Sequence, residues 1–305
     1  MNLMSFEYFI ALNKKRSFTH AAQQLHITQQ TLSTHIASLE HELGCQLIIR
    51  RVPLELTYAG KVFLRYAEKI QADLQNMHRE FCDITENHKG VLKIGVAFTR
   101  SRAIIPNLIY KFQKKYPNIE IQLLEDSNQA LSYHLKNGNI DIAIANFPNI
   151  DKEIETLDFY NEEIALIIPK HLIVQMGHTE ADILEIKNYI DLSKLCKYPF
   201  LVSSPNDIAG YIGERLLSQA GFLPIIKAKS DNIETLLTLC LQGMGVCFCP
   251  INLAYISLAP NTIDKVLIIH LGEQAKYPIQ FGVTKTNYQW NIISEFIRIS
   301  REHKI

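Results

Sequence analysis

The spacing of apolar residues predicts three short helices at the start of the chain, over residues 4–15, 19–25 and 28–43. In each segment apolar side chains recur three or four positions apart, so they share one helical face. Thr19 and Thr28 are residues that commonly cap the start of a helix. We therefore expect two helices on either side of a tight turn, packed on the first helix.

The third helix has an exposed face of hydroxyl and amide side chains, which is unusual because few charges keep such a face soluble. The residues of this face are Thr28, Gln29, Gln30, Thr31, Ser33, Thr34 and His35. Short hydroxyls and amides are donors and acceptors that read base edges in a DNA major groove. Ser17 and Thr19 stand at the start of the second helix. Each of them is expected to cap the helix, to contact the DNA backbone, or to do both.

A short hairpin follows the third helix. Residues 46–51 have the pattern of a strand that ends in Arg50 and Arg51, and residues 54–56 have the pattern of the returning strand. Two positive charges at the tip of such a wing would lie against a phosphate backbone.

From residue 17 to residue 60 the chain resembles the LysR-type transcriptional regulators. The matching positions are Ser17, Phe18, Thr19, Ala21, Ala22, Leu25, His26, Ile27, Thr28, Gln29, Thr31, Leu32, Ser33, Ile36, Leu39, Glu40, Leu43, Gly44, Arg50, Leu56, Thr57, Ala59 and Gly60. The chain departs from the family at Gln30, where Pro or Ser is usual, and at Ile48, where Phe is usual.

The resemblance implies a sequence-specific, DNA-binding transcriptional regulator with an α/β fold and an α-rich N-terminal head. The head, a winged helix-turn-helix domain, is expected over residues 1–58, a linker and dimerisation helix over 59–88, and an effector-binding domain over 89–305. The partners that the resemblance implies are double-stranded operator DNA, a small-molecule effector, further copies of the chain in a homodimer or homotetramer, and RNA polymerase.

The linker region has the pattern of one long helix over residues 58–86. Its apolar residues recur with a seven-residue period on two seams, which is typical of helices that pair with each other. The seams consist of Phe63, Ile70, Met77 and Ile84, and of Ala67, Leu74 and Phe81. We expect both seams to contact a second copy of the chain; packing against the chain's own core is the alternative.

From residue 90 onward, short apolar strands alternate with helices, which indicates a mostly parallel sheet covered on both faces. This half resembles the type-2 periplasmic-binding-protein fold. The resemblance implies two α/β lobes, joined by two crossing strands, with a small-molecule cleft between them. Lobe I is expected over residues 90–161 and 270–305, and lobe II over residues 162–269.

Ligands of open α/β sheets bind beyond the carboxyl ends of the strands, where helix N-termini offer N–H groups. The residues that follow the predicted strands are Thr99, Arg100, Ser101, Arg102, Ser127, Asn128, Asn146 and Phe147 in lobe I, and Ser203, Ser204, Asn206, Asp231 and Asn232 in lobe II. Hydroxyls, amides and two arginines suit a small anionic effector such as a carboxylate. Helix capping alone is the alternative for each residue.

The 305-residue chain has a formal net charge of zero, which argues weakly against nucleic-acid binding by bulk electrostatics. Its first sixty residues carry five basic and four acidic side chains. We therefore expect DNA binding to depend on hydrogen bonds, helix N-termini and dimerisation more than on a basic surface.

Other features narrow the class of protein. The chain has no apolar run of about 18 residues that would span a membrane, and its start lacks the basic segment of a signal peptide. Its six cysteines lack the spacing of zinc ligands or of a disulfide framework. We expect a cytoplasmic protein without a metal or cofactor.

Two alternatives compete with an effector-responsive regulator. An enzyme with an attached DNA-binding head is disfavoured, because no G-x-S-x-G, H-E-x-x-H or phosphate-binding G-x-x-x-x-G-K motif occurs. A constitutive DNA-binding protein, whose α/β half serves only oligomerisation, is the other alternative. A cleft filled with apolar side chains would favour it.

Overall fold

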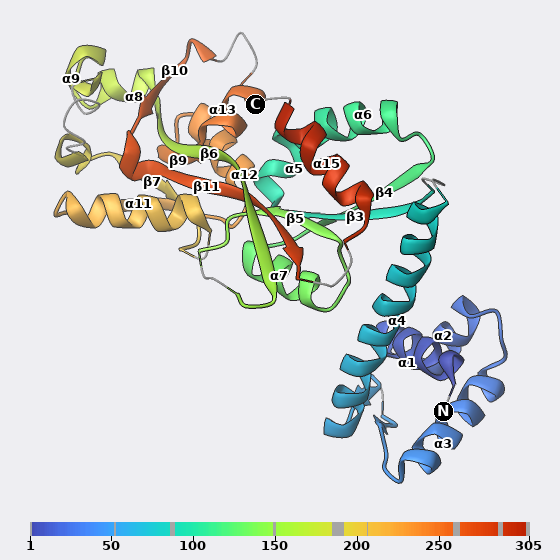
Figure 1. Ribbon diagram of the computed structural model, residues 1–305. Coiled ribbons are helices and arrows are strands. Elements are labelled where there is room, and N and C mark those ends of the chain that lie inside the picture. Colours follow the sequence, from blue (N-terminus) through green and yellow to red (C-terminus); the bar gives the residue numbers. More distant parts are fainter. Residues whose placement is uncertain are drawn as a thin grey trace.

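In the computed structural model a helical head, one long helix and a larger α/β body follow one another along the chain (Figure 1). The structure describes residues 2–51, 53–85, 89–148, 151–184, 192–205, 207–258, 263–285 and 289–302. Within these ranges, no helix combines the length and the apolar character needed to cross a membrane. The predicted α/β fold with an α-rich head is confirmed.

The head consists of three helices that share one apolar core. They are α1 (Leu3–Lys15), α2 (Phe18–Gln24) and α3 (Gln29–Leu43). Ser17, and not Thr19 as predicted, is the N-cap of α2, because its side chain accepts a hydrogen bond from the backbone N–H of His20. His26, in the turn before α3, has a φ of 56°, a left-handed conformation that histidine adopts more readily than most residues.

The wing is a two-stranded antiparallel hairpin of β1 (Ile48–Ile49) and β2 (Glu55–Leu56). Gly44 ends α3 with a φ of 68°, so the chain turns sharply from the helix into the wing. Glu40 of α3 then fixes the start of β1, because its Oε1 accepts hydrogen bonds from the backbone N–H groups of Leu47 (2.8 Å) and Ile48 (3.1 Å).

The long helix α4 (Tyr58–Ile84) packs with its first half on the head. The ring of Phe63 lies 5.6 Å from that of Phe6 and 4.9 Å from that of Phe9, centroid to centroid. Ala67 is fully buried in the same core. The prediction that Phe63 and Ala67 contact a second copy is therefore wrong, because the chain's own α1 covers them.

The second half of α4 keeps an exposed apolar stripe. Met77, Phe81 and Ile84 have exposed fractions of 46%, 61% and 70%. Leu74 is half-buried, and Ile70 is half-buried against the head. The exposed members of the two predicted seams therefore lie in the part of α4 beyond the head.

Among the described residues, the sheet of the body has nine strands. Eight follow the order β4-β3-β5-β11-β6-β9-β7-β8, and β10 also pairs with β6. The strands are β3 (Gly90–Val96), β4 (Ile119–Glu125), β5 (Ile142–Ala145), β6 (Ile154–Pro169), β7 (Pro199–Val202), β8 (Ile225–Lys229), β9 (Val246–Pro250), β10 (Val266–His270) and β11 (Lys276–Thr284). β3 runs parallel to β4 and β5, and β7 runs parallel to β8 and β9.

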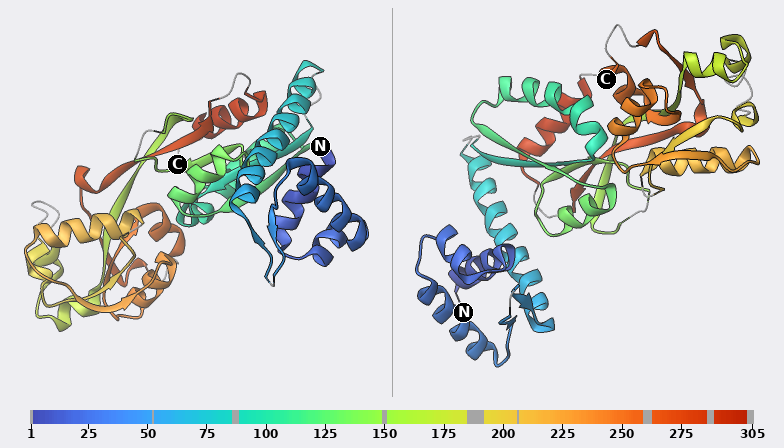
Figure 2. Two further views of the ribbon diagram at one scale, coloured as in Figure 1. Left: turned by 90° about the horizontal axis from the view of Figure 1, so that it is seen from below. Right: turned by 180° about the vertical axis from the view of Figure 1, so that it is seen from behind.

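Strand β6 divides the body into two lobes, which the views of Figure 2 show side by side. Its first part, Ile154 to Glu163, pairs with β11 in lobe I, and its remainder, Ile164 to Pro169, pairs with β9 and β10 in lobe II. The chain enters lobe II through β6 and returns to lobe I through β11.

Helices cover both lobes. Those of lobe I are α5 (Phe98–Ala103), α6 (Ile105–Lys115), α7 (Asn128–Lys136) and α15 (Asn291–Glu302). Those of lobe II are α8 (Lys170–Gln175), α9 (Glu180–Leu184), η1 (Leu192–Leu195), α11 (Ile208–Gln219), α12 (Ile233–Leu241) and α13 (Ile251–Ser257), and η2 (Glu273–Ala275) precedes β11.

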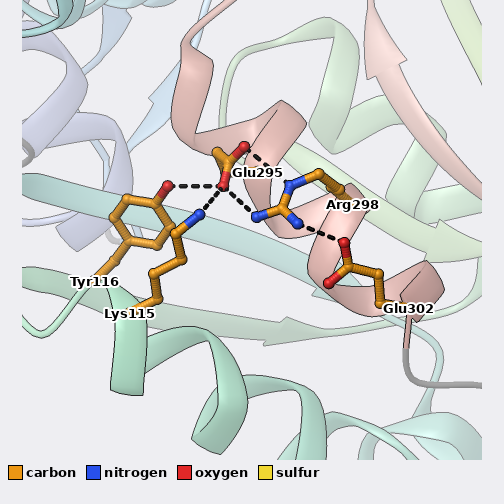
Figure 3. Close-up of polar contacts among 5 residues, drawn as sticks. All are labelled: Lys115, Tyr116, Glu295, Arg298 and Glu302. Carbon is orange, nitrogen blue, oxygen red and sulfur yellow. Dashed lines mark hydrogen bonds and ion pairs between the residues drawn. The ribbon is translucent and has the colours of Figure 1, made fainter.

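Glu295 of α15 ties this helix to the end of α6 (Figure 3). Its Oε2 accepts from Lys115 Nζ and from the hydroxyl of Tyr116, each over 2.7 Å, and from Arg298 over 2.8 Å. These donors, Arg298 first, hold the pKa of Glu295 well below its usual range. The carboxylate therefore stays ionised and keeps both helices on one face of lobe I.

Candidate functional site

The exposed side of α3 and of the turn before it carries most of the predicted DNA-reading residues. Thr28, Gln29, Gln30, Thr31 and Thr34 are exposed. The hydroxyl of Thr19 donates to Oε1 of Gln29 over 3.0 Å. This bond joins α2 to the first residue of α3 and orients the Gln29 amide.

Three of the predicted DNA-contacting residues have structural roles within the head, and a fourth is half-buried. The hydroxyl of Thr28 caps α3 by accepting from Thr31 N–H (3.1 Å), and Ser17 caps α2. Ser33 is half-buried. The half-buried ring of His35 meets Tyr8 of α1 edge-on at 5.1 Å, so His35 belongs to the packing between α1 and α3.

Both wing arginines are exposed and have acidic partners. Arg50 Nη2 lies 3.3 Å from Oε2 of Glu40, and Arg51 pairs with Glu55. The side chains of Arg50 and Arg51 are 53% and 61% exposed. A phosphate could replace the exposed Glu55 carboxylate at Arg51, whereas the Glu40 carboxylate beside Arg50 is only 12% exposed.

Arg100, expected in an anion site, is instead buried at the junction of the lobes. It is 2% exposed, and its Nη2 lies 3.3 Å from Oε2 of Glu162, which is also 2% exposed. The hydroxyls of Tyr160 and Tyr277 both donate to Glu162. Burial raises the pKa of both tyrosines well above the ordinary value, so they remain protonated donors. The prediction that Arg100 binds the effector is wrong, because Glu162 already neutralises it.

The residues after β4 and β5 stabilise lobe I locally. Ser127 caps α7 by accepting from Ala130 N–H (3.3 Å). Asn128 Oδ1 accepts from the N–H of Asn146 (3.2 Å), whose amide donates to Pro278 O (2.9 Å). Phe147 packs so closely on Gly282 of β11 that an added Cβ there would lie 2.4 Å from its ring. The capping alternative thus describes Ser127, whereas Asn128, Asn146 and Phe147 make other contacts within lobe I.

A cavity of about 480 Å³ lies between the lobes, where α5 and the end of β4 face the start of α12. Its lining is Phe98, Thr99, Ser101, Arg102, Glu125, Asp231, Asn232, Ile233 and Glu234. Of these, Thr99, Ser101, Arg102, Asp231 and Asn232 are among the residues that the sequence analysis names after the predicted strands. Arg102 of lobe I pairs with Glu234 of lobe II over 2.6 Å, so an ion pair bridges the cavity.

Ser203 and Ser204 line a second cavity, of about 500 Å³, between β7, β8 and α11 of lobe II. Its wall is mostly apolar and includes Leu201, Leu217, Phe222, Ile226 and Phe248. Ser203 also donates to Asp207, the N-cap of α11, and burial raises the pKa of that carboxyl. Asp231 lines both cavities, and Asn206 lies outside the described residues.

The lining of the interlobe cavity also contains two acidic residues that the sequence analysis did not name, Glu125 and Glu234. Glu125 ends β4 and Glu234 lies in the first turn of α12, so both follow the rule that ligands bind at carboxyl ends and helix starts. An expectation of an anionic ligand directs attention to hydroxyls, amides and arginines, and it passes over carboxylates.

A winged helix-turn-helix head on a long helix, followed by two α/β lobes around a cavity, defines a class of ligand-responsive DNA-binding proteins. The family models agree: residues 3–61 match the bacterial regulatory helix-turn-helix protein, lysR family, and residues 85–304 match the LysR substrate binding domain. The chain belongs to the LysR family. It is a DNA-binding transcriptional regulator with an effector-binding domain.

Relatives and solved structures extend over nearly the whole chain. A "Probable RuBisCO transcriptional regulator" of Trieres chinensis is 31% identical over 265 residues, covering 85% of this chain and 83% of its own. BenM of Acinetobacter baylyi is 28% identical over 278 residues (88% and 89%). In fold, the chain is similar to full-length CbnR in complex with its target DNA (TM-score 0.68, 23% identity, 99% of each chain) and to a full-length OxyR variant of Pseudomonas aeruginosa (0.72, 20%, 99% and 95%).

Proposed function

We propose that the protein binds a dyad-symmetric operator as a homodimer or homotetramer, and that a small molecule between the lobes alters this binding. The exposed hydroxyl and amide face of α3 is the observation that carries the proposal. On α3, Gln29, Gln30, Thr31 and Thr34 are proposed to face the major groove, with Thr19, Arg50 and Arg51 against the backbone.

The proposed assembly uses the exposed stripe of α4. Met77, Phe81 and Ile84 lie beyond the head, so two copies of α4 can pair there without disturbing the head core. Twofold pairing presents two α3 helices to successive major grooves, about one DNA turn apart. Such an arrangement favours a palindromic operator.

The coupling between ligand and DNA is proposed to pass through the second half of α4. Arg79 donates to both carboxylate oxygens of Asp141 (2.7 and 2.8 Å) and to Val91 O (3.1 Å). Val91 lies in β3 and Asp141 directly precedes β5, and β3 leads at its other end to the interlobe cavity. A ligand-induced movement of one lobe relative to the other would therefore shift α4, and with it the head, through the contacts of Arg79.

The interlobe cavity is open, and apart from Phe98 and Ile233 its described lining residues are polar or charged. This supports an effector-responsive regulator over a constitutive one, because a cleft filled with apolar side chains would favour the latter. We further propose that the ligand is bound and released unchanged, that the regulator acts in the cytoplasm, and that it contacts RNA polymerase at its promoters.

The test is selection of operator sites from a random DNA library by the full-length protein. We expect enrichment of sites with two half-sites about ten base pairs apart, centre to centre. A pool without sequence enrichment would contradict sequence-specific recognition. Enrichment of single half-sites would instead contradict twofold binding.

A further inference from the structure

The interlobe cavity and the lobe II cavity adjoin, and their walls differ in character. Asp231 lines both, so it marks the place where they meet. The lobe II cavity is lined mostly by apolar side chains such as Leu217, Phe222 and Ile226, and its described lining also contains Glu214 and Lys229. The interlobe cavity offers hydroxyls and charged groups. A ligand that occupies both must be apolar at one end and polar at the other.

Carboxylates dominate the charge of the interlobe cavity. Among the described residues, its lining contains Arg102 as the one basic residue and Glu125, Asp231 and Glu234 as acidic residues. Arg102 is already paired with Glu234, over 2.6 Å. Glu125 accepts from the hydroxyl of Ser101, which adds no positive charge. Within the described lining of the interlobe cavity, the charges left to a ligand are therefore the negative ones of Glu125 and Asp231.

An anionic ligand finds little to bind it in this cavity. Arg100 is buried against Glu162, away from the lining. One of the free backbone N–H groups in the first turn of α12 already has a partner, because the Asn232 side chain accepts from Thr235 N–H over 3.1 Å. A carboxylate would have to displace Glu234 from Arg102 in the presence of two further acids.

We propose that the effector is a small amphipathic molecule that carries an ammonium group, placed between Glu125 and Asp231, with its apolar part in the lobe II cavity. This inference rests on the proposed function of the cavity and replaces the anion expected from the sequence. Both free amines and zwitterionic amino compounds contain this chemistry. An ammonium group supplies three donors to acceptors that lack a positive partner within the described part of the lining.

The experiment titrates the full-length protein with three probes of similar size by isothermal calorimetry: 2-phenylethylammonium, L-phenylalanine and 3-phenylpropanoate. We expect at least one ammonium probe to bind about tenfold more tightly than 3-phenylpropanoate. Tighter binding of 2-phenylethylammonium identifies the free amine as the class, and tighter binding of L-phenylalanine the zwitterion. Equal or stronger binding of 3-phenylpropanoate overturns the proposal, as does the absence of binding by all three up to their solubility limits.

Matched variants locate the binding. Glu125→Gln removes a cavity charge at the end of β4, whereas Glu120→Gln makes the same change at the exposed start of that strand. Ser218→Trp obstructs the lobe II cavity from an exposed position of α11, whereas Gln219→Trp adds the same bulk beside it, off the lining. We expect the first of each pair to weaken ammonium binding several-fold and the second to leave it unchanged. Equal effects within a pair overturn the placement.

Operator binding of the same samples separates the two proposals. If 3-phenylpropanoate binds at least as tightly as the ammonium probes while the protein still binds its selected operator, the proposed regulatory function is retained. Only the proposed class of ligand is then wrong. If neither the operator nor any probe binds, the proposed function itself fails.

Discussion

Arg100 and Glu162 form an ion pair in which both side chains are 2% exposed. Replacing Arg100 alone by Ala leaves the Glu162 carboxylate buried without its positive partner. We predict that Arg100→Ala lowers the free energy of unfolding by about 3–5 kcal/mol, whereas Arg100→Met combined with Glu162→Gln restores most of the loss. Urea denaturation of the three proteins measures both values. An Arg100→Ala protein with an unchanged free energy of unfolding would contradict this account. So would a double variant that is no more stable than Arg100→Ala.

Gln29 is the residue for which a reading role is best defined, because Thr19 orients its amide. We predict that Gln29→Ala costs about 1–3 kcal/mol of operator affinity and relaxes discrimination at one base position. Binding titrations against single-base operator variants measure this. Gln23, exposed on α2 and outside the predicted face, provides the matched Gln23→Ala control. A uniform loss across all operator variants would make Gln29 a phosphate contact.

At the scale of single residues, prediction from the sequence succeeded where the cause is local. The cap at Thr28 depends only on the first turn of α3. The burial of Arg100 could not be predicted in this way. Its partner Glu162 is distant in the sequence, and a charged residue after a strand ordinarily faces solvent.

At the scale of elements, the exposed stripe of α4 makes a prediction that separates assembly from folding. Phe81 is 61% exposed, so Phe81→Glu should abolish pairing and leave the head stable. Phe63 is 8% exposed in the head core, so Phe63→Ala should cost about 3–5 kcal/mol of stability without directly removing a pairing contact. Sedimentation equilibrium and thermal unfolding measure the two effects. A Phe81→Glu protein that stays dimeric would exclude this stripe as the seam.

The Glu295 cluster between α6 and α15 predicts a pH dependence of stability. The folded-state pKa of Glu295 is lowered from its ordinary 4.5, so its stabilisation is present above pH 4.5 and is lost as the pH falls through the lowered value. Because the site is partly exposed, we expect Glu295→Gln to cost about 1 kcal/mol or less at neutral pH. The difference from the unmodified protein should shrink below pH 4.5, as denaturation at several pH values can show. A difference independent of pH would contradict the ionic origin.

The periodicity of apolar residues predicts the helices and most strands, but it does not predict where β6 begins. The apolar run from Ile164 to Pro169 predicts a strand that begins the second lobe. The structure extends this strand back to Ile154 through polar and charged positions, because β11 pairs with that part. Pairing with a strand more than a hundred residues later in the chain cannot be read from local alternation.

At the scale of the whole molecule, the family resemblance supplied the arrangement of head, linker helix and two-lobed body. It did not supply the composition of the cavity, because that depends on how the lobes face each other. Arg102 and Glu234 form an ion pair only when α5 and α12 approach across the interlobe cavity.

The contact between α4 and lobe I gives the last prediction. Arg79 and Asp141 are 14% and 8% exposed, and Gly138 approaches α4 so closely that an added Cβ would lie 2.7 Å from that of Ala72. Arg79→Ala removes the three bonds that this side chain donates to lobe I. We therefore expect amide exchange in residues 76–84 to accelerate about tenfold or more, while residues 58–67, which pack on α1, stay protected. Arg65→Ala, on the exposed side of the same helix, is the matched control. Hydrogen-exchange mass spectrometry resolves the two segments. Unchanged exchange in residues 76–84 would show that α4 is held by other contacts, and the route from cavity to head would then have to bypass Arg79.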